Sequence, residues 1–262
     1  MALCLGTAQL AQKYGIFKKP DHETSFDILS AAFDCGIEYI DTAPTYGEAE
    51  HVIGEFLKSN GLRAKIITKI PKFMGTDPKL FIDHCKRSAI DSMRALGRNQ
   101  LWGVLLHDAQ NAKDFWNELL GLKTWFLVSG VTSNFGVSLY DPEDLGYRFL
   151  GLYQIPMNMM DTRFMEVPKE DFFWGGNTIM VRSVYLQGKI QEHRKALAFV
   201  KKAIGKMTRH NLIVLGCENA DQVKANANMF NNDLEISEDE YNQILEGGKN
   251  PDMEKVDPRR WK

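Results

Sequence analysis

The chain has few cysteines, and their arrangement suggests no shared task. Cys4, Cys35, Cys85 and Cys217 lie far apart, without the paired spacing of a zinc site or a redox motif. Disulfides are rare in reducing compartments, so unpaired thiols are typical of a cytoplasmic protein. We therefore expect no metal site, and three of the thiols are predicted to pack as small apolar side chains.

The sequence also lacks a long apolar run and an excess of charge of either sign. No stretch approaches the roughly 18 apolar residues of a membrane span, and residues 1–11 lack the basic segment of a secretory signal. The formal net charge is −2 for 262 residues, which gives no general attraction to nucleic acid or to an anionic membrane. We expect a cytoplasmic protein without a nucleic-acid or membrane partner; the sequence indicates no particular protein partner.

No run rich in Pro, Ser and Gly divides the chain, which is typical of a single domain over residues 1–262. Short apolar segments alternate with segments of helical periodicity, and this alternation predicts α/β architecture. Eight such repeats fit a (β/α)8 TIM barrel better than an open sheet. The polar segment 247–262 is expected to form a tail after the last helix.

Local signals place several helices and the eight strands. Asp77-Pro78 opens one helix and Asp141-Pro142 a shorter one, because Asp caps a helix and Pro suits its first turn. Ser237 and Glu240 form a capping box for a short helix near the end of the sequence. The crossover around 167–176 is poor in helical pattern, so the sixth helix has the faintest signal. The strands are expected at residues 3–8, 37–40, 65–70, 101–106, 134–139, 152–157, 178–181 and 212–215.

Four polar residues follow three successive strands of this pattern. Asp41 ends the strand 37–40, and Tyr46 lies in the turn-rich loop after it. Lys69 ends the next strand, and His107 follows the one after that. Each residue taken singly has an ordinary explanation in a turn or in packing. Because the carboxyl ends of parallel strands meet at one edge of a barrel, their order favours a shared site.

The segment 37–57, IEYIDTAPTYGEAEHVIGEFL, resembles the aldo-keto reductase signature, in which Asp, Thr, Ala and a Tyr-Gly pair follow the second barrel strand. Other motifs follow in family order over residues 3 to about 230, and the sequence looks most like bacterial members linked to surface-sugar metabolism. These motifs are Gly6-Thr7, Tyr14-Gly15, Lys69, His107, Gly136-Val137-Ser138, Gln154, Arg182-Ser183, Gln187-Gly188 and the segment 216–226.

The resemblance implies reduction of an aldehyde or ketone with NADPH or NADH. No side chain supplies hydride, so a nicotinamide cofactor must do so. Tyr46 would donate the proton to the carbonyl oxygen, with the phenol pKa brought towards neutrality by the Lys69 ammonium. Asp41 would keep Lys69 charged and in place. His107, in its neutral form, would donate a hydrogen bond to the substrate oxygen.

The resemblance also implies a set of cofactor contacts. The helix start after the last strand matches the family segment that holds the adenosine phosphates through backbone N–H groups. Ser138 and Gln154 match residues that bind the nicotinamide carboxamide, although a Ser hydroxyl often bonds its own turn instead. Arg182 stands where many members stack a Tyr on the nicotinamide ring. The full expected set is Gly6, Thr7, Asp41, Ser138, Gln154, Arg182, Ser183, Gly216, Cys217, Gln222 and Asn226.

The chain departs from the family pattern at several of these positions. Many members hold the 2′-phosphate of NADP with a Lys and an Arg, where this chain has Gly216 and Gln222. NADPH and NADH therefore both remain possible, with Lys224 or Arg209 as compensating cations. Leu139 replaces an Asn that commonly contacts the nicotinamide. These departures favour a second interpretation, a nicotinamide-binding regulatory subunit with little or no turnover.

The substrate is expected to be a small carbonyl compound, and the bacterial resemblance suggests a sugar or nucleotide sugar. Candidates for the pocket mouth share an aromatic ring. The tail lacks the long loop that often closes the pocket in family members, so the resemblance implies an open pocket. A metal-dependent barrel lyase or isomerase would need clustered ligands at several strand ends, where only Asp41 and His107 offer themselves. The aromatic candidates are Tyr14, Phe73, Trp174 and Tyr185.

Overall fold

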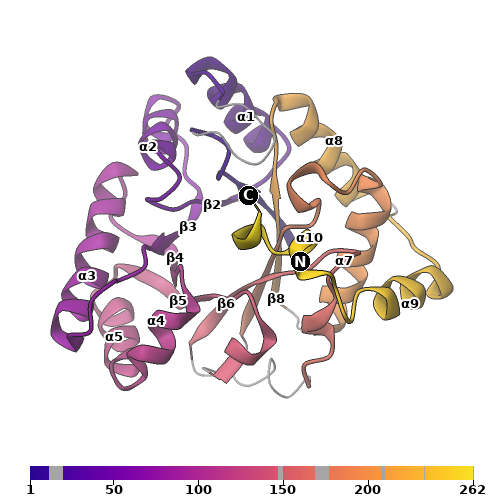
Figure 1. Cartoon of the computed structure of the whole chain (residues 1–262). Coiled ribbons are helices and arrows are strands. Elements are labelled where there is room, and N and C mark those ends of the chain that lie inside the picture. The colour runs from indigo at the N-terminus through magenta and orange to yellow at the C-terminus, as the bar shows by residue number, and fades with distance from the viewer. Residues whose placement is uncertain (12–19, 147–149, 169–176, 208–209, 233, 262) are drawn as a thin grey trace.

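Parallel strands close into a barrel in the computed structural model, which describes residues 1–11, 20–146, 150–168, 177–207, 210–232 and 234–261 (Figure 1). Each strand pairs with the next in chain order and the last pairs with the first, which confirms the predicted (β/α)8 barrel. The strands are β1 Ala2–Gly6, β2 Tyr39–Asp41, β3 Lys65–Ile70, β4 Leu101–Leu106, β5 Thr132–Ser138, β6 Gly151–Pro156, β7 Thr178–Arg182 and β8 His210–Gly216.

Helices surround the barrel on its outside (Figure 1). The helices differ from the sequence prediction at two places. A short additional helix, α4, precedes α5. The segment after Asp141 forms a 3-10 turn, η1, in place of the expected α-helix. Most of the 167–176 crossover lies outside the described residues. The α-helices are α1 His22–Asp34, α2 Ala49–Ser59, α3 Pro78–Ala95, α4 Ala109–Asp114, α5 Trp116–Val128, α7 His193–Met207, α8 Ala220–Asn231, α9 Glu238–Gly247 and α10 Met253–Val256. The 3-10 turns are η1 Pro142–Gly146, η2 Arg163–Met165, η3 Leu186–Gly188 and η4 Pro258–Arg260.

Side chains from the capping positions begin the helices that the sequence predicts there. The Asp77 carboxylate accepts a hydrogen bond from the backbone N–H of Lys79 at 2.7 Å, and Pro78 is the first residue of α3. The Ser237 hydroxyl accepts from the N–H of Glu240 at 3.2 Å and donates to its carboxylate at 2.9 Å. Both predicted caps are therefore confirmed.

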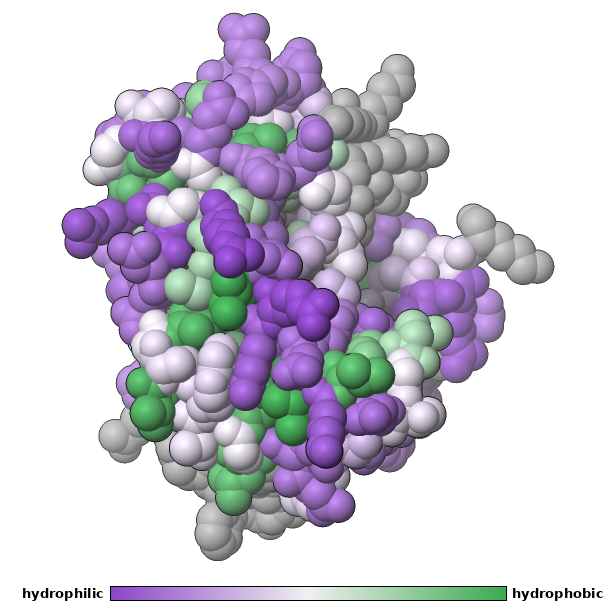
Figure 2. All heavy atoms as spheres, turned by 90° about the vertical axis from the view of Figure 1, so that its left-hand side faces the viewer, coloured by the Kyte–Doolittle hydropathy of each residue, from purple (hydrophilic) through white to green (hydrophobic). Residues whose placement is uncertain are grey.

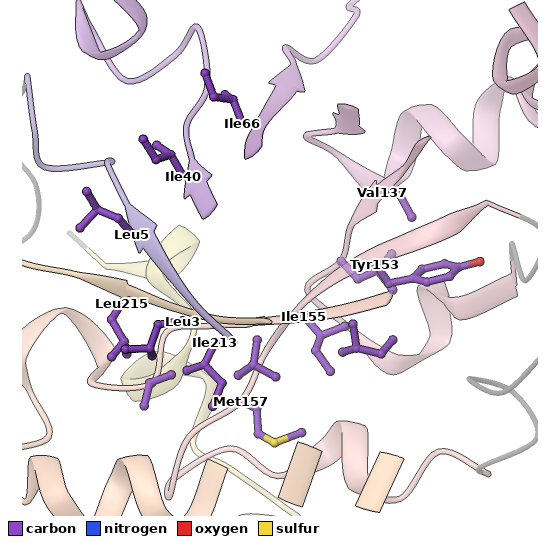
Figure 3. Packing of buried hydrophobic residues seen from close by; sticks show 14 of the residues in the cluster. Leu3, Leu5, Ile40, Ile66, Val137, Tyr153, Ile155, Met157, Ile213 and Leu215 are labelled. Carbon is purple, nitrogen blue, oxygen red and sulfur yellow. The ribbon is translucent and has the colours of Figure 1, made fainter. Parts of the chain in front are cut away.

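The strands bury alternate side chains on the two sides of the barrel wall. Leu3 and Leu5 of β1 lie in the layer between strands and helices, where Figure 3 shows them, while Cys4 between them belongs to the interior. This period of two follows from the pleat of a strand. Cβ on Gly136 would overlap the carbonyl oxygen of Leu152, so β5 and β6 approach closely only because glycine is there. The interior side chains are Cys4, Ile67, Leu105, Leu152, Met180, Leu212 and Val214.

The register of the strands aligns three positions that bear on function. Gly6 at the end of β1 pairs with Asp41 of β2 on one side and with Gly216 of β8 on the other. Adjacent strands lie about 4.8 Å apart, so these positions form one row across the carboxyl end of the barrel. The strand register therefore places Asp41, expected to be catalytic, in the same row as Gly216, which belongs to the segment expected to bind the cofactor phosphates.

Residues 247–261, predicted as a polar tail, fold against the loops that follow β5 and β7. They include α10 and η4, and they bury Val256 and Asp257. The Arg259 guanidinium bonds the Asp141 carboxylate at 3.1 Å, and the Lys189 ammonium lies 3.2 Å from the centre of the Trp261 ring. Charged, aromatic and apolar contacts with distant parts of the chain therefore hold this segment in place.

The outer face turned towards the viewer in Figure 2 is largely hydrophilic, with separate apolar patches. Leu80 on α3 and Leu120 and Val128 on α5 are exposed apolar residues. A groove of about 630 Å³ lies against α2 and α3, and none of the residues expected to bind cofactor or substrate lines it except Phe73. Such scattered patches are normal for a protein surface.

Among the described residues, no helix is both long enough and apolar enough to cross a membrane.

Candidate active site

A buried ion pair lies at the carboxyl ends of β2 and β3. The Lys69 ammonium donates to the Asp41 carboxylate at 2.8 Å and to the backbone carbonyl of Thr42 at 3.0 Å. The two side chains are 1% and 6% exposed. Burial opposes the charged ammonium, but Asp41 and then Tyr46 outweigh it, so the pKa of Lys69 is raised. Lys69 therefore remains a cation at neutral pH.

The Tyr46 phenol lies next to this ion pair. The Lys69 nitrogen is 4.8 Å from the centre of the Tyr46 ring, and the ring meets the His107 imidazole edge to face at 5.9 Å. Burial raises the pKa of Tyr46, Lys69 lowers it and Asp41 raises it, with a net increase. The sequence-based expectation of a pKa near neutrality thus differs from the structure, because burial outweighs the cation. The phenol stays protonated, as a proton donor requires.

His107 is neutral in this arrangement. Burial, followed by the Lys69 and Arg182 cations, lowers its pKa from 6.5 to about 3. The Thr45 hydroxyl lies 3.4 Å from Nδ1 of the ring. A hydroxyl that donates to Nδ1 would leave the proton on Nε2, where it can be offered to an oxygen.

Two residues expected to bind the nicotinamide carboxamide form a chain to the buried carboxylate. The Ser138 hydroxyl donates to the Gln154 side-chain carbonyl at 3.2 Å, and the Gln154 amide donates to Asp41 at 3.0 Å. All three side chains are buried. Asp41 therefore accepts from Lys69 and Gln154 through the same oxygen, and four strands contribute to one polar network.

A cavity of about 150 Å³ opens beside this network. It extends from Asp41 and Tyr46, across the loop after β7, to the end of β8 and the start of α8. Seven of the expected cofactor-binding residues line it. They are Gly6, Thr7, Asp41, Arg182, Ser183, Gly216 and Gln222.

Four expected cofactor residues are buried and do not line the cavity. Besides Ser138 and Gln154, these are Cys217 and Asn226. The Asn226 amide donates to the Cys217 sulfur at 3.3 Å, and its carbonyl accepts from the Tyr185 hydroxyl at 2.9 Å. Burial raises the pKa of Cys217 to about 11, so its thiol is neutral. Cys217, Asn226 and Tyr185 thus form a hydrogen-bonded group next to the cavity, and Tyr185 is the member that lines it.

The loop after β7 holds three non-glycine residues in left-handed backbone conformations. Ser183, Leu186 and Gln187 have φ angles of 64°, 48° and 53°. Such conformations are uncommon for residues with side chains and often occur at functional sites. All three residues line the cavity, so the strained backbone forms one of its walls.

Arg182 places a cation near Tyr46 and His107, at one end of the cavity. Its guanidinium donates to the carbonyl of Leu139 at 2.9 Å and lies 4.1 Å from the centre of the Tyr140 ring. Arg259 lies 4.0 Å from the centre of the same ring. A cation over an aromatic face is stabilised by the ring quadrupole. Tyr140 therefore links the last residues of the sequence to the cavity.

The sequence interpretation missed several residues that line the cavity, above all Gln9 and Glu218. Gln9 had no recognisable signal. Glu218 had a weak signal, because it lies between the end of β8 and Asn219, the cap of α8. Residues at a helix start can contact a bound anion. Tyr14, Gly15, Trp174 and Arg209, named from the sequence, lie outside the described residues.

Within the described part of the chain, no group of three or more His, Cys, Asp or Glu residues could hold a metal ion.

The chain is similar in part to curated dehydrogenases. It is 40% identical over 75 residues to pyridoxal 4-dehydrogenase from Microbacterium luteolum, a match covering 28% of this chain and 21% of that protein. It is 33% identical over 147 residues to D-arabinose 1-dehydrogenase from Saccharomyces cerevisiae, covering 53% of this chain and 42% of that protein. The chain thus aligns with less than half the length of either relative.

Solved structures share the fold over nearly the whole chain. An aldo-keto reductase from Bacillus halodurans, in its holo form, matches with a TM-score of 0.76 at 18% identity, covering 99% of this chain and 95% of that one. An aldo/keto reductase from Klebsiella pneumoniae in complex with NADP and acetate matches with a TM-score of 0.69 at 18% identity, covering 96% and 92%. At these identities the likeness shows the barrel fold.

The sequence model of the Aldo/keto reductase family matches residues 2–166, more than half of the 262 residues. The sequence motifs, the closed barrel and the family match agree, and the chain belongs to the aldo/keto reductase family.

Proposed function

We propose that this protein reduces an aldehyde or ketone with a nicotinamide cofactor, with Tyr46 as the proton donor. The observation that carries the proposal is the contact of a protonated phenol with a buried lysine cation beside a cavity at the barrel end. Asp41 holds that cation in place. Family membership supports the same chemistry.

The cavity has features that suit a dinucleotide. Gly6 and Gly216 leave the ends of β1 and β8 without side chains, and the start of α8 lies beside them. Backbone N–H groups at a helix start favour phosphate oxygens. The bound cofactor would supply the hydride. Thr7, Arg182 and Ser183 are proposed to contact it from the other walls, and the Klebsiella pneumoniae structure with NADP supports this class of cofactor.

The buried network controls the proton. Reduction places negative charge on the carbonyl oxygen, and the Tyr46 hydroxyl would transfer its proton there. Lys69 lowers the energy of the resulting phenolate, while Asp41 prevents the lysine from losing its own proton. Neutral His107 would donate a hydrogen bond from Nε2 to the same oxygen and orient it.

For the substrate we propose a sugar or nucleotide-sugar carbonyl. The name of the yeast relative, D-arabinose 1-dehydrogenase, supports a sugar as the chemical class. We also propose a cytoplasmic location, on the unpaired cysteines.

Turnover of Tyr46→Phe tests the proposal against its alternative, a regulatory subunit that binds nicotinamide without turning over. The variant keeps the ring but loses the transferable proton, so turnover of an aldehyde and sugar panel should fall by about 10² to 10⁴-fold. Dinucleotide affinity, measured by fluorescence titration, should stay within twofold of the parent protein. Unchanged turnover would refute the assigned donor, and dinucleotide binding without any turnover in the parent protein would favour the regulatory subunit.

A further inference from the structure

The wall formed by the end of β8 and the start of α8 carries an acidic residue, Glu218, that lines the cavity. Glu218 and Gln222 both line the cavity and bond each other twice. The Glu218 backbone N–H donates to the Gln222 carbonyl at 2.9 Å, and the Gln222 amide donates to the Glu218 carboxylate at 3.0 Å. This closed ring fixes the direction of the carboxylate and occupies the amide that an anion would otherwise attract.

The neighbouring position 216 offers no cation and little room for one. Gly216 has no side chain, and Cβ added there would overlap the side-chain oxygen of Gln9. Gln9 is 8% exposed, so it is packed into the wall instead of extending into solvent. A lysine could enter at 216 only if Gln9 moved.

Other charged groups do not reverse this balance. Arg182 is the one lysine or arginine among the described residues that line the cavity, and it acts at the opposite end, on Tyr46 and His107. Lys224 is exposed on α8 and does not line the cavity. Asp221 adds a further negative charge in the first turn of α8. The described part of this wall is therefore neutral or acidic.

NADPH and NADH differ by one phosphate on the adenosine ribose. That 2′-phosphate carries nearly two negative charges at neutral pH, and proteins bind it with arginine or lysine. A carboxylate at the same place accepts hydrogen bonds from the free ribose hydroxyls of NADH instead. Placing it against the phosphate would bring like charges together, which weakens binding strongly.

We infer that this site selects NADH over NADPH, and that Glu218, held by Gln222, is the residue that selects. The inference rests on the proposed function, since it places the adenosine end of a dinucleotide against α8. Glu218 would accept hydrogen bonds from the ribose hydroxyls of NADH and repel the 2′-phosphate of NADPH.

Equilibrium binding of NADH and NADPH, without any carbonyl substrate, tests the inference. Fluorescence titration of the parent protein should give a Kd for NADH at least about tenfold below that for NADPH. Glu218→Gln removes the charge but keeps the shape, and it should tighten NADPH binding by about tenfold while weakening NADH binding a few-fold. Gln222→Arg adds a cation and should shift the preference in the same direction.

Asp221→Asn is the matched control. It removes one negative charge from the same helix start, at an exposed position that does not line the cavity, so the ratio of the two Kd values should change less than twofold. Tighter NADPH than NADH binding in the parent protein would overturn this inference alone. So would equal shifts of the ratio in Glu218→Gln and Asp221→Asn. Failure of both dinucleotides to bind would overturn the proposed function as well.

Discussion

The two ends of the cavity are built in different ways. At the catalytic end, Asp41 and Lys69 extend from neighbouring strands and are held by hydrogen bonds in the barrel interior. At the other end, the wall formed by the end of β8 and the start of α8 (the β8–α8 wall) carries Glu218 and Gln222, which come from a loop and a helix start and bond mainly each other. Removing the charge of Asp41 or Lys69 must disturb an ion pair buried between two strands, whereas the β8–α8 wall can change its charge without disturbing a strand. We therefore expect substitutions at the β8–α8 wall to change cofactor preference with little loss of stability.

Lys69→Met should break the catalytic end and produce the largest effect. It leaves the Asp41 carboxylate buried without its cation, so the free energy of unfolding should fall by about 3 to 5 kcal/mol. Carbonyl reduction at neutral pH should be lost. Urea denaturation and turnover measure the two effects.

Lys65→Met is the control for this prediction, because Lys65 lies on the same strand and pairs with Glu38 on the surface. Those side chains are 45% and 66% exposed. An exposed pair contributes at most about 1 kcal/mol, so this variant should remain near the parent stability and turnover. Similar losses in the two lysine variants would contradict the claim that burial gives the Lys69 pair its importance.

Two glycines at the strands sharpen the contrast between rigid and adjustable regions. Gly136→Ala forces Cβ against the backbone of β6, which cannot move without breaking strand pairing, and should lower the free energy of unfolding by about 3 kcal/mol. Gly216→Ala meets only the end of the Gln9 side chain and should lower it by about 1 kcal/mol or less. Thermal and urea unfolding compare them. Equal losses of unfolding free energy would mean that the β8–α8 wall is as rigid as the barrel.

The His107→Gln variant tests whether burial lowers the pKa of His107, through the pH dependence of the free energy of unfolding. The folded pKa of about 3 lies below the ordinary 6.5, so the unfolded chain binds a proton that the folded protein excludes as pH falls from 6.5 towards 3. Over this window His107 should reduce stability by about 1.4 kcal/mol per pH unit. Between pH 6.5 and 5, the free energy of unfolding should therefore fall by about 2 kcal/mol less in the variant than in the parent protein. Urea denaturation at the two pH values measures the difference. Parallel stability curves for the two proteins would show that His107 titrates normally.

Local signals predicted much of the fold, because they act within a few residues. The Asp77 cap, the Ser237 capping box and the strand 65–70 all depend on neighbours in sequence. The 3-10 turn after Asp141 replaced an expected helix; its short apolar pattern did not distinguish the two. The folding of residues 253–261 depends on distant partners such as Asp141, which no local pattern reveals.

In the candidate site, too, the sequence predicted some residues but not the contacts between residues that are distant in sequence. The resemblance identified Asp41, Tyr46, Lys69 and His107, and strand order brought them together. It could not reveal that Gln154 bonds Asp41, since the two are 113 residues apart in sequence. Nor could it give the direction of the Tyr46 pKa shift, which depends on how burial compares with the nearby charge. Glu218 was missed because its place on the cavity wall and its bonds to Gln222 arise only in the folded chain.

The most direct test of the account is a double-mutant cycle with Tyr46→Phe, Lys69→Met and the variant carrying both changes, measured as single-turnover rates of carbonyl reduction. If Lys69 acts through the Tyr46 phenol, the double variant should be no slower than the slower single variant, because either change removes the same proton transfer. Losses that multiply in the double variant would mean that the two residues act independently, and the proposed coupling would be wrong.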